Sequence, residues 1–215
     1  WKSGEMFWQP LYLRGGLSLS ASGSYDGTNL KVEQAVAELP EAGRVQFAAL
    51  WDTKQSALAE CSARGSNLAL GKLFTDYAKP FLGKGALAES TLYGHADVDW
   101  QYRHGATQSL RLTLRDAGIA DTAQRFALLG VNSDIDWQAD APRTANIAFS
   151  GGELLGVPLG GGQWTVQMRG MEFNVAQATL PVLDGKLELS NLNLLRKNDQ
   201  WHWQFAASLS RISME

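Results

Sequence analysis

SLRLTLR, residues Ser109–Arg115, alternates apolar and polar side chains without a break. Successive side chains of a β-strand point to opposite faces of the sheet, so Leu110, Leu112 and Leu114 share one face and Arg111 lies on the other. A strand with one apolar and one polar face is typical of antiparallel sheets, because buried parallel strands are apolar throughout. The stretch therefore predicts a half-buried antiparallel strand.

The same alternation recurs along most of the chain. It is clearest in Asp97–Arg103, Gln163–Arg169 and Trp201–Leu209. Weaker examples are Leu17–Ser22, Leu30–Val36, Val45–Trp51, Phe126–Leu128, Ile135–Trp137, Ile147–Phe149, Met171–Val175 and Leu187–Leu189. Turn signals separate them at Asp26-Gly27, Gly151-Gly152, Gly160–Gly162 and Asp184-Gly185, and the run Gly156–Gly162 is interpreted as a flexible hairpin connection. We expect a mainly β fold, a long antiparallel meander of amphipathic strands.

One segment departs from this pattern. Apolar residues follow helical spacing at Leu70, Leu73, Phe74, Tyr77 and Phe81. Ser66 or Asn67 is available as a cap, and Pro80 would end the helix. The spacing predicts one short α-helix near residues 69–79, Ala69–Lys79.

A single short helix cannot cover the apolar faces of so many strands. The sheet must pack against a second sheet, close into a barrel, or curl into a trough. Composition favours the closed arrangements. In an open trough the apolar face would attract a ligand, because large exposed apolar patches rarely lack a partner.

The bulk composition indicates a globular chain. Of 215 residues, 45% are hydrophobic and 19% are charged, which fits one large domain. The chain begins at Trp1, and Ser208–Glu215 still reads as a strand, so we expect residues 1–215 to be a single β-rich fragment of a larger protein. The stretch Asp97–Gln101 (DVDWQ) recurs as Asp134–Gln138 (DIDWQ), which suggests hairpin repetition and three sub-repeats, 1–68, 85–138 and 139–215.

No catalytic, metal or cofactor site is expected. The net charge of -3 argues against nucleic acid, and no nucleophile-elbow, zincin, phosphate-loop or dinucleotide motif is present. His95 with Asp97 and Asp99 has the form of a metal cluster, but solvated charges at a strand edge are the preferred interpretation. The four aspartates Asp97, Asp99, Asp134 and Asp136 could alternatively supply the acid and nucleophile of a glycosidase, which would use Asp99 or Asp136. Cys61, the single cysteine, is interpreted as a small packed side chain.

The chain is rich in tryptophan, with eight residues. Five lie in the apolar sets of their strands and are expected in a core or groove: Trp100, Trp137, Trp164, Trp201 and Trp203. Trp1, Trp8 and Trp51 are candidates for exposure, and exposed indoles stack on sugars. A carbohydrate-binding β-sandwich is therefore the alternative function.

Several segments resemble a known family. They are Leu180–Leu189 (LPVLDGKLEL), Trp201–Phe205 and the ending Ser210–Glu215, together with Ile119–Asp121, Phe126-Ala127, Ile135–Trp137, Ser150–Leu154 and the opening Leu17–Gly27. In these stretches the chain resembles the AsmA-like envelope proteins, closest to the YdbH-type intermembrane phospholipid transport proteins, formerly labelled dicarboxylate transport. The matching motifs are short strand-and-turn patterns spread over most of the chain.

This resemblance implies a periplasmic protein of a Gram-negative bacterium, anchored in the inner membrane through other parts of the parent protein. It implies an open trough that phospholipid acyl chains occupy, no catalytic residues, and an outer-membrane lipoprotein as a partner. The chain is then a non-enzymatic segment of a bridge between the two membranes. The side chains expected to line the groove are Val98, Trp100, Leu110, Leu112, Leu114, Ile147, Phe149, Trp164 and Val166.

Overall fold

The computed structural model describes residues 6–8, 11–13, 16–79, 82, 87–198 and 200–210. Nearly all of this is antiparallel sheet. A two-stranded sheet joins β1 (Met6–Trp8) to β2 (Leu11–Leu13). The second sheet has twelve strands, which lie side by side in the order in which they occur along the chain. The prediction of a mainly β antiparallel meander is thus confirmed.

The large sheet begins with β3 (Ser18–Tyr25) and ends with β14 (Gln200–Leu209). Between them lie β4 (Asn29–Leu39), β5 (Gly43–Asp52), β6 (Ala57–Ala69), β7 (Ser90–Arg103), β8 (Ala106–Asp121), β9 (Phe126–Gln138), β10 (Arg143–Leu154), β11 (Val157–Arg169), β12 (Glu172–Val182) and β13 (Gly185–Lys197). Every neighbouring pair is antiparallel.

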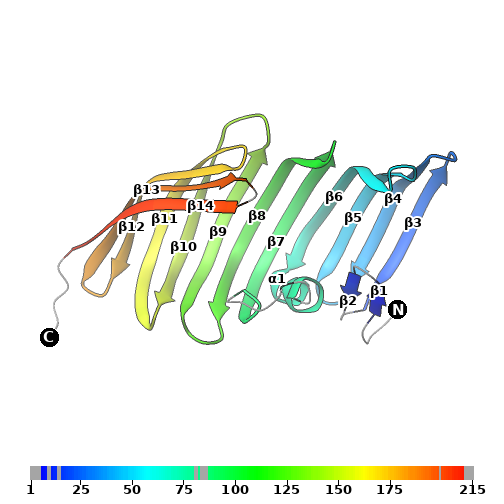
Figure 1. The fold of residues 1–215 in the computed structure, drawn as a ribbon. Helices are drawn as coiled ribbons and strands as arrows, with labels where there is room; N and C mark the ends of the chain where they lie inside the picture. Colours follow the sequence, from blue (N-terminus) through cyan, green and yellow to red (C-terminus); the bar gives the residue numbers. More distant parts are fainter. Residues whose placement is uncertain are drawn as a thin grey trace.

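The sheet is an open trough. Figure 1 shows β3–β10 as a gently twisted row, and β12–β14 turning forward so that β14 crosses in front of the row in this view. All ten residues of β14 are exposed, so the curl does not press this strand onto the sheet. The closed sandwich and barrel favoured by composition are not formed, because β3 and β14 stay at opposite edges of one sheet. Alternation cannot distinguish these cases, since each needs the same amphipathic strands.

The short helical segment connects β6 to β7. It consists of α1 (Leu70–Leu73), which continues directly as a π-helical turn, η1 (Phe74–Ala78). The prediction of one short helix is confirmed, but neither expected cap is used. Ala69 occupies the N-cap position without a side-chain hydrogen bond, because Ser66 and Asn67 still belong to β6. Pro80, expected to end the helix, lies outside the described residues.

Two glycine-rich stretches, Gly151-Gly152 and Gly160–Gly162, were predicted to be turns, and this prediction is wrong because both lie within strands. Gly151 and Gly152 lie within β10 and pair with Gly160 and Leu159 of β11, so the hairpin turn is instead at Leu155-Gly156. Both turn residues have positive φ, 51° and 80°, as a two-residue hairpin requires. A side chain at Gly152 would place its Cβ 2.4 Å from the backbone oxygen of Ala127 in β9. Close approach of neighbouring strands therefore selects glycine there.

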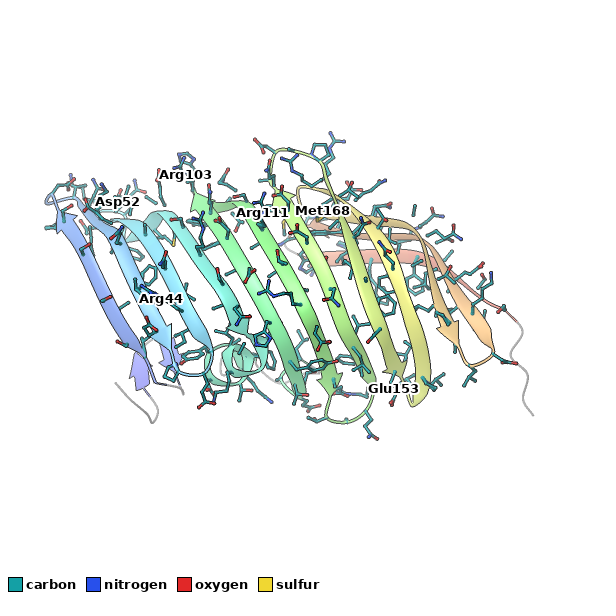
Figure 2. The ribbon with its side chains drawn as sticks, turned by 180° about the vertical axis from the view of Figure 1, so that it is seen from behind. Arg44, Asp52, Arg103, Arg111, Glu153 and Met168 are labelled. Atoms are coloured by element: carbon teal, nitrogen blue, oxygen red, sulfur yellow. The ribbon has the colours of Figure 1, made fainter. Side chains whose placement is uncertain are left out.

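Directly opposed residues of an antiparallel pair share a face, so the strand pairing defines two surfaces. The first, here called the trough face, carries apolar rows along all twelve strands. Its side chains include Leu19, Ala21, Ala35, Phe47, Ala63, Val98, Trp100, Leu110, Leu112, Ile135, Trp137, Ile147, Trp164 and Val166, followed by Phe173, Leu187, Leu189 and the odd-numbered residues of β14. Figure 2 looks from behind onto the opposite surface, here called the polar face, where Arg44 and Arg111 are labelled.

Candidate functional site

The candidate site is the trough face itself. Eight of the nine predicted lining residues are only half-buried: Val98, Trp100, Leu110, Leu112, Leu114, Ile147, Trp164 and Val166. The ninth, Phe149, is buried, with 5% of its surface exposed. All nine lie in β7, β8, β10 and β11, so the structure brings them together on four of five consecutive strands.

The recurring sequence DVDWQ flanks β8 on both sides in matched register. Val98 and Ile135 lie opposite Leu112, while Trp100 and Trp137 lie opposite Leu110. The two copies therefore build one apolar block, in which two tryptophans and two aliphatic side chains flank the two leucines of the middle strand. This arrangement is set by pairing register, which the sequence alone did not show.

Packing on the trough face is uneven along the sheet. One buried cluster combines Ala117, Val131, Phe149, Leu180 and Val182, and Leu70 of the helix packs against it. A second, smaller cluster combines Trp137, Ala145 and Met168. Both clusters lie between β8 and β12, so the C-terminal half of the trough is partly filled by its own side chains.

Phe149 shows how this filling works. Its ring meets the Trp164 ring edge-on, with centroids 5.0 Å apart. The Phe149 ring also packs against Gly162, where an added Cβ would lie 3.0 Å from Phe149 Cζ. Gly162 therefore provides the space that the aromatic pair occupies.

Among the described residues, neither buried cluster extends to the N-terminal half of the trough face, β3–β6. Small residues lie side by side in this half, with Ala21, Ala35, Ala63 and Gly65 in neighbouring strands. The short helical segment lies at the junction of β6 and β7 and contacts these two strands and β2. Tyr77 fixes the helical segment by donating a 2.6 Å hydrogen bond from its hydroxyl to the backbone oxygen of Gly16.

The tryptophans of the trough face differ in how their indole N–H groups are satisfied. Trp137 donates to the backbone oxygen of Gly170 at 2.6 Å, and Trp100 donates to Thr107 Oγ1 at 3.1 Å. The buried indole N–H of Trp164 has no hydrogen-bond partner among the described residues.

Trp201 and Trp203 lie on the expected face of β14 but are 48% and 69% exposed, so they line an open edge. Trp51 is 41% exposed, as the alternative hypothesis expected. Trp1 and the side chain of Trp8 lie outside the described residues.

The polar face carries a ladder of charges. Arg64 in β6 pairs with Asp99 in β7 at 2.5 Å, and Arg111 in β8 pairs with Asp136 in β9 at 3.6 Å. Beside this ladder, Arg115 makes a bidentate contact with Asp97, at 2.6 and 2.7 Å. These hydrogen bonds, with a third from the Asn67 backbone N–H, hold the pKa of the Asp97 carboxyl well below its usual range.

These ion pairs bear on the metal and glycosidase hypotheses. His95 and Asp97 do share the polar face, but Asp97 is bound by Arg115 and Asp99 by Arg64. Among the described residues, no group of three His, Cys, Asp or Glu side chains is arranged to hold a metal ion. Asp99 and Asp136 lie on either side of Arg111 and are each neutralised by a guanidinium.

Two shallow hollows, of about 440 and 500 Å³, lie on the polar face where the small residues Ala48 and Ser62 interrupt the long side chains. Their rims are charged, with Arg44, Arg64 and Glu60 among the residues that line them. Because both hollows have charged rims, the apolar candidate site remains the trough face.

Cys61 lies on the trough face, between Ala49 of β5 and Tyr102 of β7. Burial raises the pKa of its thiol, which favours the protonated form. No described helix is long and apolar enough to cross a membrane.

No protein-family model matches the chain, and neither the curated proteins nor the solved structures contain a significant match to it. A function is therefore inferred from the fold and from the geometry of the trough face.

Proposed function

We propose that this chain is a non-enzymatic segment of an apolar conduit for phospholipid acyl chains. The observation that carries the proposal is the open trough face: one amphipathic sheet of twelve strands with no second layer among its described residues. Its lining leucines, valines and tryptophans remain half-buried rather than sealed in a core. Contiguous apolar surface of this kind normally has a partner.

The energetics suit reversible occupancy. Moving a methylene group from water to apolar surroundings is favourable by about 0.8 kcal/mol. A lipid that leaves a bilayer for the trough keeps most of this stabilisation, because its chains exchange one apolar environment for another. Transfer in either direction is then nearly balanced, as conduction requires.

The dimensions suit movement along the sheet. Neighbouring strands lie about 4.8 Å apart, so the eleven strand-to-strand steps from β3 to β14 span about 50 Å. One acyl chain reaches about half of the roughly 30 Å hydrocarbon core of a bilayer. The trough is therefore longer than its ligand, and a lipid has several successive positions rather than one fitted pocket.

The polar face supports the same function. Its ladder of paired Arg and Asp side chains is largely exposed, whereas the trough face is apolar, so the sheet would separate water from an acyl chain. We place the chain in the periplasm, within a parent protein anchored in the inner membrane and reaching toward an outer-membrane lipoprotein. This placement is supported by the resemblance of Leu180–Leu189 and Leu17–Gly27 to the AsmA-like envelope proteins.

Native mass spectrometry of the purified chain, followed by lipid extraction, tests the proposal. Phospholipid that co-purifies in a defined ratio is the expected result. A chain that remains free of lipid, and that also fails to take up fluorescent phosphatidylethanolamine from micelles, would contradict it.

A second candidate function rests on the aromatic residues of β14. Trp203 and Phe205 stack with ring centroids 5.3 Å apart, and both are exposed. Such a platform also suits a sugar ring. Retention on a glycan array that Trp203→Ala abolishes would favour carbohydrate binding over the lipid conduit.

A further inference from the structure

Two neighbouring hairpins end in leucines whose backbone conformation is unusual. Leu155 has a φ of 51° and Leu183 a φ of 52°, in the left-handed region that residues with a Cβ rarely adopt. Ten non-glycine residues in the described part of the chain have positive φ, and these two are the only apolar ones. The other eight are Glu41, Ser56, Asn67, His104, Asp116, Gln124, Asn191 and Asn198. Local conformation therefore does not explain the two leucines.

The Leu155-Gly156 turn shows the mismatch most clearly. Leu154 pairs with Val157, so the loop has two residues, and both have positive φ. Turns of this kind favour the sequence Asn-Gly, because asparagine tolerates the left-handed conformation. Leucine has no polar group that would offset the strain. Asparagine at position 155 would therefore suit the fold better than the residue that is present.

The same two leucines are exposed to water. Leu155 is 75% exposed, the highest value among the large hydrophobic residues in the described part of the chain, and Leu183 is 62% exposed. Beside Leu155, Leu154 and Val157 are 47% and 38% exposed. Neither Leu155 nor Leu183 belongs to a buried cluster or packs against one. Packing does not account for them either, which leaves a partner outside the chain.

Both leucines lie at one edge of the sheet. β10 and β12 run in the same direction, because each is antiparallel to β11 between them, so the turns that follow them share an edge. Figure 1 shows both turns at the lower edge of the sheet in this view. The buried residues Leu180 and Val182 of the trough face lead along β12 to Leu183. The two tips are thus the exposed end of an apolar surface that continues into the trough.

The Leu155 tip is held in place by the neighbouring turn. Its backbone N–H donates a 2.8 Å hydrogen bond to the backbone oxygen of Arg125, between β8 and β9. The Arg125 side chain is in turn fixed by hydrogen bonds to Asp121 and Glu89. A backbone group that is already paired can enter apolar surroundings without leaving an unsatisfied donor. The tip is therefore preorganised for insertion.

A lipid bilayer fits these tips better than a folded protein does. A stable protein interface buries about 800 Å² on each partner, whereas two separate turns present only small convex surfaces. A bilayer needs no matching shape and is stabilised by each apolar side chain that enters it. The tip segments 153–158 and 181–186 contain only three charged residues, Glu153, Asp184 and Lys186. Because there is no basic cluster to attract anionic lipid, the expected bilayer is zwitterionic.

We propose that the β10–β11 and β12–β13 hairpins dock the chain on a zwitterionic lipid bilayer, with the side chains of Leu155 and Leu183 inserted among the acyl chains near the surface. This contact places one edge of the trough face against the bilayer. It does not require lipid in the trough, so it is tested separately from the conduit.

Cosedimentation with phosphatidylcholine vesicles tests the contact. The unmodified chain should bind equally at low and high salt, because apolar insertion does not depend on ionic screening. Leu155→Asn and Leu183→Asn should each weaken vesicle binding about tenfold, which corresponds to about 1.4 kcal/mol. His104→Asn is the matched control: His104-Gly105 is also a two-residue turn with positive φ, but it follows β7 and lies at the opposite edge. This control should bind like the unmodified chain.

Urea denaturation separates docking from a role of the leucine in folding. Leu155→Asn should raise the urea midpoint, because Asn-Gly suits the turn better, while vesicle binding falls. A lower midpoint together with weaker binding would mean that Leu155 serves the fold, and would contradict the proposal.

Two results of the vesicle experiment would overturn the proposal. One is unchanged binding of both leucine variants, and the other is binding of the unmodified chain that disappears at high salt. Lipid uptake distinguishes the contact from the conduit. Leu155→Asn should still take up fluorescent phosphatidylethanolamine from micelles, whereas Leu112→Asp should lose this uptake and still bind vesicles.

Discussion

Trp100 and Trp137 lie opposite the same residue, Leu110, one on each side of β8. The indole of each is anchored by a hydrogen bond, to Thr107 and to Gly170 respectively. Leu110 is thus the centre of the apolar block that the repeated DxDWQ sequence builds.

Leu110→Ala should lower the free energy of unfolding by roughly 1–2 kcal/mol, below the 2–5 kcal/mol typical of fully buried leucines, because Leu110 is half-buried. Urea denaturation monitored by tryptophan fluorescence measures the change. Ser109→Ala, on the polar face of the same strand, should change the stability by no more than about 0.5 kcal/mol. Equal effects of the two substitutions would show that the two faces do not differ in packing.

Gly162→Val should destabilise the fold by about 1–3 kcal/mol, because the new side chain would meet the Phe149 ring. Combining it with Phe149→Leu in a double-mutant cycle should recover part of this loss, since the smaller side chain frees the space. Strictly additive losses in thermal unfolding would mean that the contact between the two positions is not the cause.

Acid should remove the stabilisation supplied by Asp121. Arg125 donates to both oxygens of this carboxyl, at 2.6 and 2.8 Å, and lowers its pKa from 3.8 to about 2. A carboxyl with a depressed folded pKa contributes fully above its unfolded pKa and loses its contribution as pH falls through the folded pKa. Asp121→Asn should therefore be less stable than the unmodified chain at neutral pH, and the difference should shrink between pH 3.8 and about 2. Urea midpoints that differ equally at all pH values would contradict this.

The native Cys61 provides a reporter inside the trough. An environment-sensitive fluorophore attached to its thiol should shift to shorter wavelength when phosphatidylglycerol micelles are added, because acyl chains would replace water around it. The same fluorophore on Ser62→Cys in a Cys61→Ser background lies on the polar face and should not shift. A shift at both positions would indicate nonspecific adsorption.

The sequence allowed the strands and their faces to be predicted where alternation is strong, as in Leu110–Leu114. It did not reveal β6, because Ala57–Ala69 consists mostly of small and polar residues whose apolar face is marked only by Ala63, Cys61 and Gly65. Such residues pack well in a close-spaced sheet but leave no clear hydrophobic period.

The prediction of a turn at Gly151-Gly152 also failed because small residues have more than one structural role. Gly151 and Gly152 resemble a turn, yet they are selected by close backbone approach within β10. The matched register of the DVDWQ and DIDWQ segments around β8 also depends on strand pairing at long range. The repeat could be seen in the sequence, but the position of its two copies on either side of β8 could not. The sequence also did not distinguish a closed sandwich from an open sheet.

The most direct test of the lipid conduit compares phospholipid retention by two variants of β8. Leu112 lies on the trough face between Val98 and Ile135, whereas Ser109 lies on the polar face between Gln101 and Gln138. Both variants, Leu112→Asp and Ser109→Asp, add one carboxylate to the same strand, and circular dichroism confirms that each is folded. We expect extracted phospholipid per chain to fall sharply for Leu112→Asp and to remain unchanged for Ser109→Asp. Equal retention by two folded variants would contradict a role of the trough face in holding lipid.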